Sequence, residues 1–220
     1  MPSAAKDVLK DYLQGARDVL VWKLDGLSEH DLRLPRTPTG TNLLGLVKHA
    51  LNTEVTYFGP TFGREWPTPH ELVSPDEPDP LAGWYATENE TAAGIVDLYR
   101  RVQAFADMTI DALPLDAIGH VEHWGGAEVT LHEIMLHKTA DLQRHAGHAD
   151  ILREQIDGST GLLPRHGNMP DGTDWPAHTQ RLGAIAARFQ RGAGWAETLT
   201  RPRTVQNRRQ EPRHEEALDH

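Results

Sequence analysis

The residues with the greatest potential for chemistry lie in one stretch, residues 131–156, where acidic and histidine side chains recur at helical intervals. They are Glu133, His137, Asp141, His145 and His148. If this stretch is a helix, residues four apart lie on one face, about 6 Å apart along its axis, and two such side chains can grip one metal ion. Residues eight apart are separated by about 12 Å, so His137 and His145 cannot share an ion. Three pairs compete: Glu133 with His137, His137 with Asp141, and Asp141 with His145.

The apolar residues of the same stretch indicate which pair faces the interior. They form a stripe that consists of Leu131, Ile134, Met135, Leu142, Ala149 and Leu152. At about 100° per residue, His145 lies about 30° from the centre of this stripe, Asp141 about 70° and His137 about 110°. A carboxylate and an imidazole at the edge of a core are costly unless they are paired or bind an ion. The Asp141–His145 pair therefore predicts either a metal site or a simple hydrogen-bonded pair.

Helices are the elements that must position these residues. The spacing of apolar residues predicts four long helices and a shorter one, over 4–27, 42–58, 88–113, 131–156 and 176–190. Thr41 is the predicted N-cap of the second helix, and Thr130 with Glu133 has the pattern of a capping box before the fourth. Connections rich in Pro and Gly separate the helices, and no convincing strand is predicted. The expected fold is all-α: a four-helix bundle with an extra C-terminal helix and long loops.

The composition of the chain limits its possible domain organisation and its possible binding partners. The chain has 220 residues, no cysteine and a formal net charge of -10. Residues 1–190 are expected to form one domain, while residues 191–220, which lack apolar periodicity, are expected to be a disordered tail. The acidic charge disfavours nucleic-acid binding, and no apolar run reaches the ~20 residues that a membrane span needs. Without a signal sequence at its start, the chain is expected to be cytoplasmic.

Two segments carry a resemblance to a known family. GLVKHALNTEVTYF (45–58) and LHEIMLHKTADLQRHAGHADILREQIDG (131–158) resemble the DinB/YfiT-like superfamily, most closely its actinobacterial branch. Mycothiol-dependent maleylpyruvate isomerase is a distant enzyme relative in this superfamily. The resemblance covers roughly residues 5–190. It implies a four-helix bundle of unusual connectivity that binds a divalent metal.

The resemblance also implies the metal ligands, which are His49, Asp141 and His145. The middle ligand of this branch is typically Glu, whereas this chain has Asp, which is one methylene shorter. Nitrogen and oxygen ligands suit Zn, Ni, Mn or Fe, and three protein ligands leave a coordination position open, as in catalytic sites. Glu54 falls on the apolar stripe of its helix, which predicts an Arg partner or a role in orienting a ligand.

The function that the resemblance implies is that of an S-transferase or isomerase using a low-molecular-weight thiol of the mycothiol type and a small electrophile. A non-catalytic metal-binding stress or dimerisation protein and a metallohydrolase remain as alternatives. A homodimer is expected by analogy alone. The absence of cysteine is consistent with a thiol supplied from outside the chain.

Further residues are secondary candidates. His148 is a candidate general base or a surface residue. Arg144 and Arg153 are candidates for holding a carboxylate of the cofactor, or are solvent-facing charges. The remaining candidates are Trp66, Trp84 and Trp124 as pocket walls or core, and His120 and His123 as contacts of a second metal.

Overall fold

The computed structural model describes residues 5–163, 167 and 169–189. The chain divides into two compact units, Met1–Met169 and Pro170–His220. The predicted disordered tail, residues 191–220, lies outside the described residues. None of the described helices combines the length and the apolar character that crossing a membrane requires.

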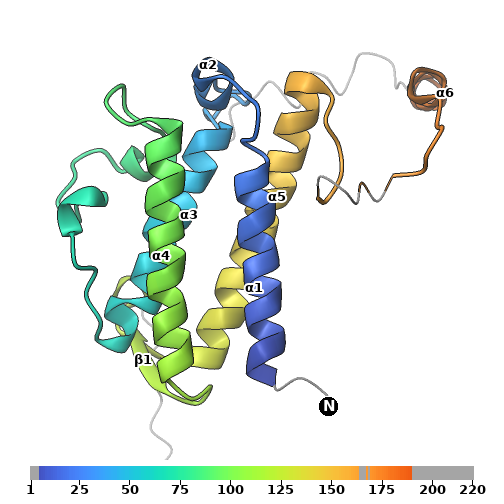
Figure 1. The fold of residues 1–220 in the computed structure, drawn as a ribbon. Helices are drawn as coiled ribbons and strands as arrows, with labels where there is room; N and C mark the ends of the chain where they lie inside the picture. The colour runs from blue at the N-terminus through green and yellow to red at the C-terminus, as the bar shows by residue number, and fades with distance from the viewer. Residues whose placement is uncertain (1–4, 164–166, 168, 190–220) are drawn as a thin grey trace, which may run out of the picture. The chain divides into compact units, whose positions relative to one another are not determined.

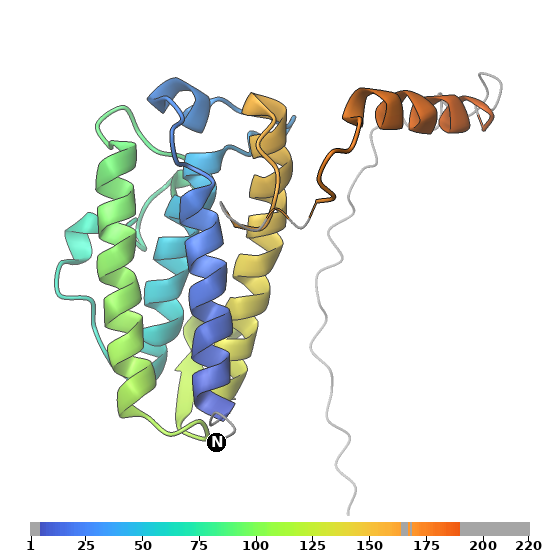
Figure 2. The same ribbon diagram turned by 45° about the vertical axis from the view of Figure 1, so that its right-hand side comes forward.

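Four long helices form the bundle of the first unit, as predicted. They are α1 (Ala5–Trp22), α3 (Leu43–Phe58), α4 (Ala92–Ala112) and α5 (Leu131–Asp157). Figure 1 and Figure 2 show α1 and α5 running in one direction and α3 and α4 in the other. In the interior α3 packs against α4 and α5, while α1 packs mainly against α5. The first and last helices of the bundle are therefore neighbours.

Because α3 and α4 run in the same direction, the chain must return along the outside of the bundle between them (Figure 1). This return segment, residues 59–91, contains three short 3₁₀ turns, η1 (Pro60–Phe62), η2 (Pro69–Glu71) and η3 (Ala82–Trp84). A short helix, α2 (Glu29–Arg33), lies in the earlier connection that the sequence predicted to be a loop. At five residues, α2 is too short to show helical periodicity.

At the helix ends, local sequence signals were sufficient to predict some of the capping residues but not all of them. The capping box of Thr130 and Glu133 is present at the start of α5, and Gly158 ends this helix in a left-handed conformation. The N-cap of α3 is Asn42 instead of Thr41, since the Asn42 side chain accepts from the Gly45 N–H at 2.8 Å. Asn and Thr both suit this position, so sequence alone did not separate two neighbouring candidates.

A small hairpin precedes α5 and corrects the prediction that strands are absent. Strand β1 (Ile118–Val121) pairs antiparallel with β2 (Ala127–Thr130), with Ile118 opposite Thr130. Two adjacent glycines, Gly125 and Gly126, take φ values of 75° and 78° in the turn, a region that favours glycine. Four residues per strand give too short an alternation for recognition from sequence.

The second unit contains α6 (Trp175–Ala187), which confirms the predicted extra helix. The Asp174 side chain caps it by accepting from the Ala177 N–H at 2.9 Å. Among its described residues none is buried.

A buried ionic network joins three helices in the core of the bundle. Arg17 of α1 lies 2.5 Å from Glu54 of α3, and both side chains are almost completely buried. Arg17 also pairs with Asp107 of α4 at 2.8 Å, and the Tyr99 hydroxyl donates to Glu54 at 3.1 Å. This network accounts for the acidic residue on the apolar stripe of α3 and gives Glu54 the Arg partner that the sequence predicted.

We predict that Arg17→Met destabilises the protein by about 3–5 kcal/mol, because it leaves the Glu54 carboxylate without its cation in the core. Urea unfolding followed by circular dichroism measures the loss. Lys10→Ala is the matched control, since Lys10 is also a cation of α1 paired with an acid of α4, Asp111, but at the surface. A loss in Arg17→Met no larger than in Lys10→Ala would contradict the prediction.

Candidate metal centre

The structure brings His49, Asp141 and His145 together between α3 and α5. One potential ligand atom from each residue lies within 4.8 Å of the other two. Nε2 of His145 is 3.2 Å from Oδ1 of Asp141, and the rings of His49 and His145 meet edge to face with centroids 5.0 Å apart. The helical spacing of four explains the first contact, and the antiparallel packing of α3 against α5 supplies the second.

These three residues have the donor set of a divalent-metal site. With metal–ligand bonds of about 2.0–2.1 Å, neighbouring ligand atoms of a tetrahedral site lie about 3.3 Å apart. The separation of His145 and Asp141 already has this value. Nδ1 of His145 is buried and finds no hydrogen-bond partner among the described residues. Two imidazoles and a carboxylate therefore fit an ion such as Zn, Ni, Mn or Fe.

Lys138 is a buried neighbour of the cluster that was not among the residues singled out from the sequence. Its side chain is fully buried, and its ammonium group donates to Asp141 Oδ2 at 3.0 Å and to Thr53 Oγ1 at 2.6 Å. The signal was present in the sequence, because Lys138 lies on the apolar stripe of α5, three residues after Met135 and four before Leu142. A lysine at such a position must find a partner inside the protein.

The surroundings shift the pKa values of two members of the cluster. Burial lowers the pKa of His49 to about 4, helped by the positive charges of Lys138 and His145 and opposed by Asp141. Burial acts to raise the pKa of Asp141, but its contacts with His145 and Lys138 outweigh this effect and hold the pKa well below its ordinary value. Near neutral pH, His49 is thus neutral and Asp141 is ionised, which are the forms that bind metal.

Trp84 of η3 covers His49. The two rings are stacked with centroids 3.6 Å apart and planes 13° from parallel, and Trp84 also meets His145 edge-on at 5.7 Å. Gly45, one turn before His49, makes this approach possible. A Cβ atom at Gly45 would lie 1.9 Å from the carbonyl oxygen of Trp84. Of the tryptophans proposed as pocket walls, Trp84 is the one placed directly on the cluster.

A second group of aromatic and histidine side chains lies at the end of α3. The Tyr57 hydroxyl is 3.2 Å from Nε2 of both His123 and His137. The Trp124 ring meets His137 at 4.8 Å and Tyr57 at 5.6 Å. His137 is exposed, as its helical position predicted, and it pairs with the phenol of Tyr57 instead of serving as a ligand in the cluster.

The other candidates lie beside the cluster or away from it. His148 is exposed, and its ring lies 5.7 Å from that of His145. Arg144 is exposed as well. Arg153 is buried instead of solvent-facing, and it donates to Asp157 and to the backbone carbonyls of Lys23 and Asp25. These bonds tie the end of α5 to the end of α1.

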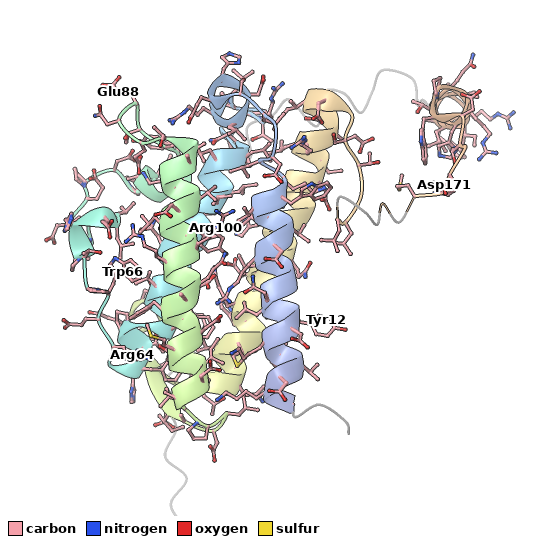
Figure 3. The ribbon with its side chains drawn as sticks, viewed as in Figure 1. Tyr12, Arg64, Trp66, Glu88, Arg100 and Asp171 are labelled. Carbon is pink, nitrogen blue, oxygen red and sulfur yellow. The ribbon has the colours of Figure 1, made fainter. Side chains whose placement is uncertain are left out.

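Three further candidates lie outside the cluster. Trp66 is buried against Phe105, with ring centroids 5.4 Å apart, and Figure 3 labels it beside α4. His120 is exposed on β1. Glu133 serves the capping box of α5, where it accepts from the Thr130 N–H at 2.7 Å.

We predict that Gly45→Ala displaces η3 and separates the Trp84 ring from His49, because the added methyl group overlaps the Trp84 carbonyl. Acrylamide quenching, compared with that of Trp84→Phe, should show a more accessible Trp84. Gly147→Ala on α5 is the control, since a Cβ atom there has no neighbour within 4 Å. Unchanged quenching in Gly45→Ala would refute the assigned role of Gly45.

A solved structure shares this fold. The chain is similar to a crystal structure described as a conserved protein of a locus from Enterococcus faecalis, with a TM-score of 0.57 and 15% sequence identity. The match covers 71% of this chain and 99% of the other. At this identity the likeness concerns the fold alone. No curated protein matches the chain significantly.

The family assignment comes from a sequence model. The model described as Mycothiol-S-transferase matches residues 8–158, which include α1, α3, α4 and α5 almost entirely, and with them His49, Asp141 and His145. This match confirms the resemblance to DinB-like proteins that the motifs of residues 45–58 and 131–158 carry. The chain therefore belongs to the mycothiol-S-transferase family.

Proposed function

We propose that this protein is a divalent-metal-dependent transferase that joins a low-molecular-weight thiol of the mycothiol type to a small electrophile. The observation that carries the proposal is the cluster of His49, Asp141 and His145 with the fully buried Lys138 against it. Family membership supports the thiol, and the donor set supports the metal.

His49, Asp141 and His145 would hold the ion through two nitrogens and one oxygen, which leaves at least one coordination position open. A divalent ion held by these residues would supply Lewis acidity that lowers the pKa of a substrate thiol. The low pKa of His49, about 4, keeps its lone pair available, so protons do not compete for this ligand near neutral pH.

Lys138 gives the site its preference for an anion. Its ammonium group is fully buried and binds Oδ2 of Asp141, which leaves Oδ1 directed at His145. Arg17 binds the nearby Glu54, so the charge of Lys138 is balanced mainly by Asp141. By offsetting the negative charge of Asp141, the ammonium group reduces the cost of placing a second anion, such as a thiolate, in this desolvated site.

The proposed reaction is a nucleophilic substitution at carbon. The thiol releases its proton to solvent, and the sulfur uses the resulting electron pair to form a bond with the electrophilic carbon. With a chlorinated aromatic as electrophile, the carbon–chlorine bond breaks and chloride departs with its electron pair. No external oxidant or reductant is required.

The first prediction of this proposal concerns metal binding. Purified protein should bind one equivalent of Zn²⁺, and Asp141→Ala should weaken binding by more than the ~10–100-fold that loss of an outer partner costs. Isothermal titration calorimetry and elemental analysis measure both quantities. Glu154→Ala, which removes an exposed carboxylate of the same helix, serves as the control and should bind like wild type. Equal Zn²⁺ binding by wild type and Asp141→Ala would show that these residues do not form the metal site.

The second prediction concerns the thiol. The metal-loaded protein should conjugate mycothiol with a chlorinated aromatic, and His145→Ala should abolish the activity. Lys138→Met should shift the alkaline rise of the rate to higher pH, because it removes the charge that favours the thiolate. Hydrolysis of the electrophile without any thiol would instead support a metallohydrolase, and metal binding without turnover would support a non-catalytic role.

A further inference from the structure

The part of the return segment that carries Trp84, residues 74–85, is here called the crossing loop. None of its residues is buried, and Leu81, Trp84 and Tyr85 are 58%, 39% and 41% exposed. Among the described residues, every hydrogen bond of this loop joins two of its own members. Examples are the Trp84 N–H, which donates to Leu81 O at 2.7 Å, and the Tyr85 hydroxyl, which donates to Asp79 at 2.7 Å. The loop is therefore held together from within, and its contacts with the bundle are packing contacts of partly exposed side chains.

The chain is attached to the bundle immediately on both sides of the crossing loop. Before the loop, Leu72 packs against the core, and the Val73 N–H donates to the Asn52 side chain of α3 at 3.0 Å. After the loop, Ala86 packs against the core, and the Arg33 side chain donates to the Ala86 carbonyl oxygen at 3.1 Å. Both ends of the loop are therefore anchored, while the residues between the anchors are not.

Between its anchors the crossing loop packs on α3 at Gly45 and reaches the metal-ligand cluster through Trp84. The Trp84 carbonyl oxygen occupies the space that a side chain at position 45 would need, since a Cβ atom there would lie 1.9 Å from it. The Trp84 ring covers one face of His49 at 3.6 Å and meets His145 edge-on at 5.7 Å. The loop thus covers the two imidazoles of the cluster with a side chain that is itself half-exposed.

We propose that the crossing loop is a lid over the imidazole side of the cluster, hinged at its two anchored ends, which opens to admit the thiol and closes over it. Segments that open locally have few buried apolar contacts and hydrogen bonds that are exposed to solvent, and the crossing loop has both features. Because its hydrogen bonds are internal, it can move as one body about its ends. The role in admitting the thiol rests on the proposed function, whereas the movement itself does not.

Distances between spin labels, measured by pulsed electron paramagnetic resonance, test the movement in the metal-free protein. The chain has no cysteine, so labels attach only at introduced cysteines. Leu81→Cys on the loop is paired with Gly147→Cys on α5, and the matched control pairs Glu88→Cys, beyond the second anchor, with the same α5 site. All three positions are exposed. Gly45→Ala, whose methyl group overlaps the closed loop, should populate a second distance in the Leu81 pair and leave the Glu88 pair unchanged.

A second variant keeps the test independent of any folding defect in Gly45→Ala. Trp84→Ala removes the stacking on His49 without touching the core, so it should release the loop in the same way. Trp124→Ala removes a tryptophan of nearly equal exposure, 40%, and should not. A second distance in the Leu81 pair alone supports the hinged lid. A single unchanged distance in both pairs, or equal changes in both, would overturn the inference.

Calorimetric titration of the Zn²⁺-loaded protein with mycothiol tests what the lid covers. Affinity should fall with the closed fraction, so Gly45→Ala with about one tenth of its molecules closed should bind mycothiol about tenfold more weakly. Zn²⁺ affinity should stay the same, since the cluster residues lie on α3 and α5 and not on the loop. Loop movement in a protein that binds neither Zn²⁺ nor mycothiol would refute the transferase function and keep the hinged loop. Unchanged mycothiol affinity in a variant with an open loop would overturn the inference.

Discussion

The rest of the site depends on the fully buried ammonium group of Lys138. A charge in this position is tolerated only with close partners, and it finds them in Thr53 of α3 and Asp141 of α5. Those two bonds fix how α3 and α5 face each other and which Asp141 oxygen is directed at His145. The next residue of α3, Glu54, binds Arg17 of α1. Core stability and the geometry of the cluster are therefore set by adjacent residues of one helix.

A second constraint comes from the connectivity. Since α3 and α4 run in parallel, the chain needs the long return segment, and its η3 turn lies against α3 at Gly45. The bundle alone supplies His49, Asp141 and His145, whereas the return segment supplies Trp84, which shapes the approach to them. The bundle and the return segment thus contribute different parts of the candidate site.

Sequence patterns predicted the helices and the bundle because the apolar stripes and the capping box at Thr130 are local signals. Helical spacing also identified Asp141 with His145. Helical spacing could not identify His49, because a contact between two helices leaves no periodic pattern in the sequence. Only the family resemblance predicted His49 as a ligand. Lys138 could have been found as a charge on an apolar stripe. The stacking of Trp84 on His49 could not, because it depends on where a loop without regular structure crosses α3.

The pairing of α1 with α5 has a consequence for biosynthesis. The first helix of the bundle has its main neighbour in the last one, so the nascent α1 leaves the ribosome without the surface that will cover it. At about 5–20 residues per second, the wait until Asp157 is polymerised is on the order of ten seconds. During this interval the apolar face of α1 lacks the helix that covers it in the folded protein, and His49 lacks the two residues with which it forms the cluster. Closure of the bundle, and with it formation of the cluster of His49, Asp141 and His145, must therefore wait for the synthesis of α5.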